Sequence, residues 1–162
     1  DSKVRPNQLF AISTTYPIIK PSSEMGKAIF KIVTKKLLVK VGLRTLAKDE
    51  EGYIAEYSGD PLKRDSSYHQ GPAWVWLLGL YFNAFTNIVD DEKDRLEKEK
   101  IKIEYEKFIQ NVFDTFKVEI NSEEGIGSIS ELYNAEAPFI PGGTFAQAWS
   151  VSEVMKIVSK MK

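Results

Sequence analysis

The chain has 162 residues, of which 43% are apolar, so its length and composition suit one domain with a buried core. Its formal net charge is −1 and its pI is about 6.0, a balance that offers no attractive field to nucleic acid or to an anionic membrane. Cysteine is absent, which excludes disulfides, thiolate metal sites and a cysteine nucleophile, and no apolar run approaches the ~18 residues of a membrane span.

The spacing of apolar residues predicts helices from the start of the chain. Residues 7–20 follow Pro6, which a first helical turn tolerates, and residues 22–38 begin with a serine cap and repeat apolar positions with helical spacing. Residues 41–71 contain glycines and a proline and indicate a long irregular loop. Residues 72–89 are almost continuously apolar, which predicts a helix that is buried on most sides.

The second half of the chain continues the helical pattern. Residues 90–120 form a charged segment with one apolar stripe, residues 119–146 return to loop, and residues 145–158 predict a last amphipathic helix. No alternation of apolar and polar residues is long enough for a sheet, and no repeat has a fixed period. The sequence therefore predicts an all-α fold with about five helices, arranged as hairpins that long loops connect.

Unusual polar and aromatic residues stand at the starts of the predicted helices. The segment "SYHQGPAWVW" holds the single histidine of the chain and two of its three tryptophans. If these helices are parallel, their N-terminal ends share one face, where the loops would gather polar side chains into a small-molecule site. The candidates at helix starts are Arg5, Asn7, Tyr68, His69, Gln70, Gln147 and Trp149.

Several of these residues also have a purely structural interpretation. A lone histidine before a helix is more often a hydrogen-bonding structural residue, and without a second histidine a multi-histidine metal site is excluded. Thr144-x-x-Gln147 matches a capping box. Trp74 and Trp76 would point in different directions on a helix, so we expect one of them in the core.

Glu131 is the carboxylate with the strongest claim to chemistry. Ser128-x-x-Glu131 also matches a capping box, yet Pro138 follows within a few residues and leaves little helix to cap. The neighbouring aromatics Tyr133 and Phe139 indicate instead a carboxylate held in a shaped loop. Spacing alone leaves both interpretations open. The chain contains neither a GxSxG nucleophile elbow nor a Walker loop.

Five sequence blocks resemble, in their order and spacing, the C-terminal glucosidase domain of glycogen debranching enzymes. They are "VRPNQLFAIS", "GLRTL", "GDPLKRDSSYHQGPAWVW", "GSISELYN" and "GGTFAQAWSVSEVM", and the resemblance is weakest over residues 90–120. Members of this family are amylo-α-1,6-glucosidases built on an α/α barrel of six helical hairpins. The resemblance implies that residues 1–162 are the C-terminal portion of one (α/α)6 glucosidase domain, and that a longer parent chain supplies the remainder of the barrel.

The resemblance also implies a reaction, namely inverting hydrolysis of the branch-point glucose of glycogen or limit dextrin by two carboxylates. Glu131 matches the family's general base. The general acid of the family lies in a Thr-Trp-Met-Asp block that this chain lacks, so we expect the chain alone to be inactive. We expect no metal, cofactor, nucleic acid or membrane partner, and a cytoplasmic location. The implied residues around the sugar are Arg5, Asn7, Gln8, Tyr68, His69, Gln70, Trp74, Gln147 and Trp149.

Two other functions stay open at this point. One is a non-catalytic helical module that binds protein or carbohydrate, in which Glu131 is a helix cap and the indoles are core residues. The other is a different α/α-barrel hydrolase, of the trehalase or glucoamylase type, with the same chemistry and another preferred linkage. The sequence also departs from the family's pattern at Asn134, Gly142 and Thr144, where many relatives carry other residues.

Overall fold

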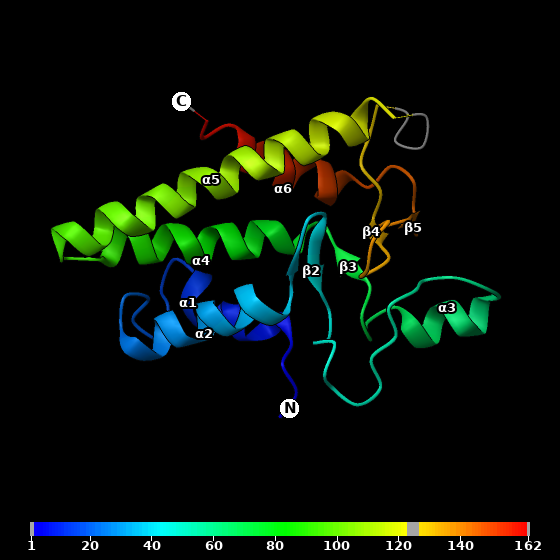
Figure 1. Ribbon diagram of the computed structural model, residues 1–162, viewed down its shortest axis with the longest axis horizontal. Helices are drawn as coiled ribbons and strands as arrows, with labels where there is room; N and C mark the ends of the chain where they lie inside the picture. The colour runs from blue at the N-terminus through cyan, green and yellow to red at the C-terminus, as the bar shows by residue number, and fades with distance from the viewer. Residues whose placement is uncertain (1, 123–126, 162) are drawn as a thin grey trace.

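Helices dominate the computed structural model of the chain, which describes residues 2–122 and 127–161 (Figure 1). The all-α prediction is therefore confirmed as the broad fold class. The helices are η1 (Pro6–Leu9, a 3-10 helix), α1 (Phe10–Ser13), α2 (Glu24–Lys36), α3 (Pro61–Ser67), α4 (Leu77–Asp91), α5 (Arg95–Ile120) and α6 (Ala148–Val158).

Helix α4 is the centre of the molecule. In Figure 1 it runs between α5 on one side and α1 and α2 on the other, and nine of its fifteen residues are buried. The Tyr81 ring lies 4.5 Å from the Phe30 ring of α2 and 4.9 Å from the Phe108 ring of α5, between ring centres. The buried helix predicted over 72–89 is thus confirmed, although it begins later, at Leu77.

Side-chain caps start three of the helices. Ser23, Asp60 and Asp94 each accept a hydrogen bond from a backbone N–H at the start of α2, α3 and α5 respectively. Such a cap stabilises a helix by about 1 kcal/mol, because it satisfies an N–H that has no partner within the helix. The serine cap predicted for the second helix is confirmed.

The first predicted helix is shorter in the structure than its pattern suggested. The sequence predicted helix over 7–20, but α1 ends at Ser13. Pro17 explains the stop, because proline disfavours a helical conformation in the residue before it and lacks an N–H. The Asn87 side chain of α4 donates hydrogen bonds to the backbone oxygens of Ile12 and Thr14, at 2.9 and 3.0 Å, and so stabilises the end of α1.

A small antiparallel sheet was not predicted, and here the sequence interpretation was wrong. Its strands hold two or three residues each, too few to show an alternating pattern. They pair in the order β1 (Leu38–Val39), β2 (Gly42–Arg44), β3 (Ala73–Trp74), β4 (Leu132–Tyr133) and β5 (Pro141–Gly142).

The sheet joins segments that are far apart in the sequence. Trp74 of β3 pairs with Leu132 of β4 in an antiparallel arrangement, which places the residues before β4 beside those after β3. The predicted loop over 41–71 contains β2 and α3, and the predicted loop over 119–146 contains β4 and β5. Among the described residues, no helix combines the length and the apolar character that a membrane span requires.

Candidate active site

Glu131 lies in a loop immediately before β4, and three groups surround its half-buried carboxylate. The Tyr68 hydroxyl donates a hydrogen bond of 2.8 Å to Oε1, and the Thr144 backbone N–H donates one of 3.2 Å to Oε2. The Gln147 amide Nε2 lies 3.5 Å from Oε1. Residues 127–134 contain no helix, so the capping-box interpretation of Glu131 is wrong. A shaped loop holds this carboxylate, as the other interpretation predicted.

Gly143 lets the loop before α6 approach this carboxylate. Its φ of +71° is a backbone conformation that residues with a side chain rarely adopt. A Cβ at this position would overlap Glu131 Oε2. The backbone N–H of Glu131 donates to the Thr144 oxygen at 2.9 Å, which ties the two loops together. The position of the carboxylate therefore depends on the absence of a side chain at residue 143.

Five rings form a continuous aromatic group beside Glu131. The Tyr68 and Trp74 rings meet edge to face at 4.7 Å, and His69 stacks on Trp74 at 5.1 Å. Trp149 meets Trp74 at 6.0 Å and stacks on Trp76 at 5.3 Å, while 43% of its surface stays exposed. This group runs from the ring that contacts the carboxylate to the N-terminal end of α4.

The two tryptophans of residues 74 and 76 divide differently from the helical prediction. Trp74 is buried and lies in β3, and its indole Nε1 donates to the Tyr68 backbone oxygen at 3.0 Å. The expectation that one of the two indoles lies in the core is thus confirmed. Trp76 is partly exposed and stacks on Trp149, although the residues predicted around the sugar included Trp74 and not Trp76. Its position immediately before the buried helix was the signal that could have identified it.

Arg5 connects the N-terminal segment to the segment before β3. Its guanidinium donates to the backbone oxygens of Thr45 and His69, at 3.1 and 2.8 Å, and to Gln70 Oε1 at 3.0 Å. The Gln8 side chain donates to the Arg5 backbone oxygen at 2.9 Å. Gln70 and the two backbone oxygens therefore fix the orientation of the Arg5 guanidinium, while Gln8 holds the Arg5 backbone.

A cavity of about 330 Å³ lies where the starts of η1 and α4 meet. Four of the predicted residues line it, while the other five lie behind it or around Glu131. The prediction that helix starts share one face is thus confirmed for η1 and α4, and the stacking of Trp149 on Trp76 adds α6. The lining residues are Arg5, Pro6, Asn7, Phe10, Thr45, His69, Trp74, Trp76 and Leu77.

The capping box predicted at the last helix is absent. Helix α6 begins at Ala148 rather than near residue 145, and Gln147 is its N-cap residue without a side-chain cap bond. The Gln147 amide instead turns toward Glu131. The interpretation of Thr144-x-x-Gln147 as a capping box was thus wrong, and Gln147 is instead a polar neighbour of the Glu131 carboxylate.

Burial raises the pKa of the Tyr68 hydroxyl well above its usual value, and the hydrogen bond to the Glu131 carboxylate raises this pKa further. Tyr68 therefore keeps its proton at all physiological pH values and acts as a donor to Glu131. Tyr133, the second residue of β4, is fully buried and donates to Glu119 Oε1 of α5 at 2.6 Å, and burial likewise raises its pKa. The strand after Glu131 is thus anchored to α5.

A second anchor follows β4. Glu136 accepts hydrogen bonds from Arg44 Nη2 at 3.2 Å and from the Tyr53 hydroxyl at 2.9 Å. Burial opposes the charged form of Glu136, but the hydrogen bond from Tyr53 and the charges of Arg44 and Lys48 outweigh it and lower the pKa. Burial and the same carboxylate raise the pKa of Tyr53 to about 12. The loop after β4 is therefore fixed, as is the strand that follows Glu131.

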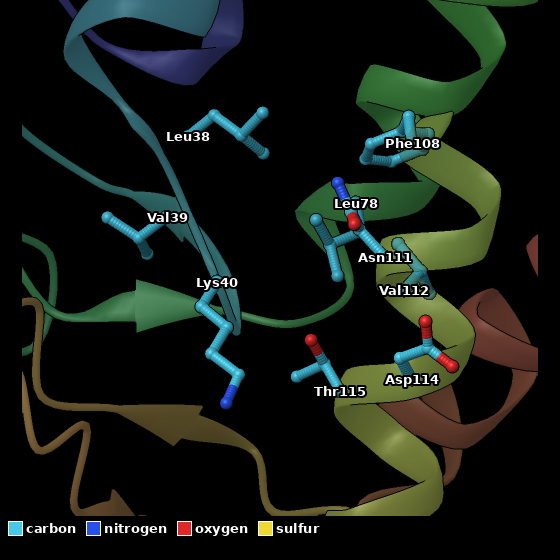
Figure 2. Close-up of a pocket in the computed structure, with 9 residues that line it drawn as sticks. All are labelled: Leu38, Val39, Lys40, Leu78, Phe108, Asn111, Val112, Asp114 and Thr115. Carbon is cyan, nitrogen blue, oxygen red and sulfur yellow. The ribbon is translucent and has the colours of Figure 1, made fainter. Parts of the chain in front are cut away.

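Two further cavities lie away from these residues. Helix α2 and strand β1 form one side of them, and α5 forms the other. One, of about 510 Å³, has β1 and its turn on one side and α4 and α5 on the other (Figure 2). Its neighbour, of about 450 Å³, shares Leu38 and Phe108 with it. Together they form what we call the α2–α5 groove, and no predicted site residue lines it. In the described parts of the chain, no cluster of three or more potential ligand side chains could hold a metal ion.

Comparison with known proteins adds two findings. The family described as amylo-alpha-1,6-glucosidase matches residues 1–156 of the chain. Over 91 residues the chain is 34% identical to the glycogen debranching enzyme of Saccharomyces cerevisiae. This alignment covers 52% of the chain and 6% of the yeast enzyme, so the chain matches only a small part of that relative.

Proposed function

The chain belongs to the amylo-alpha-1,6-glucosidase family, and on this basis we propose that it is part of a glucosidase that removes the α-1,6-linked branch-point glucose of glycogen or limit dextrin. In this proposal, residues 1–162 form the C-terminal portion of an (α/α)6 barrel domain. The observation that carries the proposal is the position of Glu131, a half-buried carboxylate fixed by Tyr68 and Thr144 beside an aromatic-lined cavity.

We assign Glu131 the role of general base. The carboxylate takes a proton from a water molecule whose oxygen attacks the anomeric carbon of the terminal glucose. The bond from that carbon to O6 of the main chain breaks, and an acid on the opposite side protonates O6. The product is glucose of inverted configuration, and inversion requires the two carboxyl groups to stand ~6.5–9.5 Å apart. Because the family's Thr-Trp-Met-Asp block does not occur in this chain, the acid in our proposal comes from outside these 162 residues.

The cavity of about 330 Å³ is the proposed site for the terminal glucose. Its volume lies within the usual range for small-ligand pockets, and its mixture of aromatic and polar walls suits a pyranose. Trp74 and Trp76 offer aromatic surfaces to the apolar face of the sugar, and Asn7 and His69 offer polar groups to its hydroxyls. Gln147 and Trp149 complete the wall toward Glu131. Gln8 and Gln70 act through Arg5, which they hold.

The remainder of the barrel is the proposed occupant of the α2–α5 groove. Several large apolar side chains of the chain are exposed, which supports a neighbouring element that covers them. On α5, outside the lining of the groove itself, Leu96, Ile103 and Val118 are 76%, 53% and 68% exposed. We further propose a cytoplasmic location, because a chain without cysteine is suited to a reducing compartment.

Replacing Tyr68 with Phe is expected to lower kcat about tenfold while KM and the melting temperature change little. The variant keeps the ring and its packing, but it removes the 2.8 Å hydrogen bond that orients Glu131. Steady-state kinetics and thermal melting of the full-length protein measure this separation. If KM rises and kcat is unchanged, the Tyr68 hydroxyl binds a sugar hydroxyl rather than orienting the base.

The test of the proposed function is glucose release by the full-length protein that contains this chain. One substrate is a maltooligosaccharide with a single α-1,6-linked glucose, and the other is the linear α-1,4 oligomer of the same size. We expect glucose from the branched substrate only. Glucose from the linear one alone would indicate a glucoamylase-type hydrolase, and glucose from neither, with retained binding, a carbohydrate-binding module.

A further inference from the structure

A second hollow, separate from the aromatic cavity, is lined in part by Tyr68. It measures about 220 Å³ and lies between α3 and the segment before it. We call it the α3 hollow, and apart from Tyr68 none of its residues has been given a role above. It is lined by Tyr57, Pro61, Arg64, Asp65 and Tyr68.

Tyr68 places this hollow next to the proposed base. Its ring forms one wall of the hollow, while its hydroxyl donates to Glu131. Its ring also meets Trp74, which lines the cavity proposed for the terminal glucose. The contact between the Tyr68 and Trp74 rings therefore joins the two concave sites, since Tyr68 lines one and Trp74 lines the other. A glycosidase that cleaves between two sugars needs one site on each side of the bond that breaks.

Tyr57 is held firmly as the second aromatic wall. Its backbone N–H donates to Asn134 Oδ1 at 2.9 Å, and two residues earlier the Ala55 oxygen accepts from the Ala135 N–H at 2.8 Å. Its ring lies 5.5 Å from that of Tyr68, tilted by 40°, and Gly142 of β5 lies against it. The segment around β4 thus carries Glu131 just before the strand and holds Tyr57 just after it, so this one segment links the base to the hollow.

Arg64 and Asp65 supply the polar wall. Both are exposed residues of α3, and no side-chain hydrogen bond or ion pair engages either of them within the described residues. A guanidinium offers several donors and a carboxylate only acceptors, so together they match the hydroxyls of a sugar. Because their charges cancel, the hollow favours a neutral polyhydroxylated ligand over an anion.

From this geometry we infer that the α3 hollow binds the main-chain glucan to which the branch glucose is attached. The inference rests on the proposed function, because it assigns the second half of the same substrate. The tyrosine rings contact the apolar face of a main-chain glucose, and Arg64 and Asp65 bind its hydroxyls. Recognition of the branch then depends on a chain that enters over α3, rather than on the terminal glucose alone.

The test uses Arg64→Ala and Asp65→Ala in the full-length protein, with two substrates. The branched maltooligosaccharide fills both sites, whereas α-D-glucosyl fluoride carries no main-chain sugar. We expect each variant to lower kcat/KM for the branched substrate about tenfold and to leave that for the fluoride within about twofold. Lys63→Ala, which removes an exposed cation from the same helix, is the control and should change neither value.

The outcomes separate this inference from the proposed function. Unchanged kcat/KM on both substrates, or equal losses on both, overturns the assignment of the hollow while the glucosidase stands. A wild-type protein that cleaves neither substrate refutes the proposed function instead. In that case calorimetric titration with maltotetraose tests whether the α3 hollow binds a glucan chain. Weaker binding by Arg64→Ala than by Lys63→Ala supports this assignment, and equal binding overturns it.

Discussion

Replacing Glu131 with Gln is expected to lower kcat of the full-length protein by about a thousandfold on the branched substrate. The amide has nearly the same shape and its oxygen still accepts the hydrogen bond from Tyr68. It no longer takes a proton from water, and general base catalysis contributes ~10²–10⁴-fold to such reactions. KM and the melting temperature should change little, since the packing is preserved.

Glu56→Gln is the matched control for this change. Glu56 is an exposed carboxylate beside Tyr57, and its loss should leave kcat within about twofold of the wild-type value. If Glu131→Gln retains a tenth or more of the wild-type kcat, Glu131 is not the base. That result would favour the alternative in which the chain is a non-catalytic helical module that acts through binding.

Gly143→Ala is expected to have the second-largest effect, a loss of about a hundredfold in kcat. The added Cβ would overlap Glu131 Oε2, so the carboxylate must move away from Tyr68 and Thr144. A displacement of about 1 Å in a catalytic group costs on the order of 10²-fold. The variant should also lose about 1–2 kcal/mol of stability, because alanine is strained at a φ of +71°.

Gly52→Ala separates the two causes. Gly52 has a φ of +86° with no atom within 4 Å of an added Cβ, so alanine there suffers the backbone strain without a collision. We expect a similar loss of stability, measured by denaturant unfolding, with wild-type kcat. Equal activity of the Gly143 and Gly52 variants would show that the loop before α6 does not position Glu131.

The helices were predictable because local forces determine them. The Ser23 cap and the apolar spacing defined α2, and the long apolar run defined α4 as a buried helix. The gathering of helix starts was also predictable, since Pro6 and Gln147 stand at the entrances of η1 and α6. These features depend on residues within a few positions of one another.

The remainder depends on contacts between distant segments. Strands of two residues carry no pattern, so the sequence did not reveal the pairing of β3 with β4. This pairing brings Glu131 near Trp74, whose indole contacts Tyr68, the donor to the carboxylate. For the same reason the sequence placed Tyr68 around the sugar but did not predict the hydrogen bond from its hydroxyl to the Glu131 carboxylate. Trp74 rather than Trp76 was predicted around the sugar because residues 72–76 were assigned to a helix, whereas Trp74 lies buried in β3 and Trp76, at the start of α4, stacks on Trp149.

The most direct test of the central claim is azide rescue of Glu131→Ala. The removed carboxylate leaves space for azide at the position of the attacking water, and azide needs no base. With α-D-glucosyl fluoride as substrate, we predict that azide restores turnover and that NMR identifies the product as β-D-glucosyl azide. Turnover of this variant at the wild-type rate without azide, or formation of the α-azide, would contradict the assignment of Glu131 as the base of an inverting glucosidase.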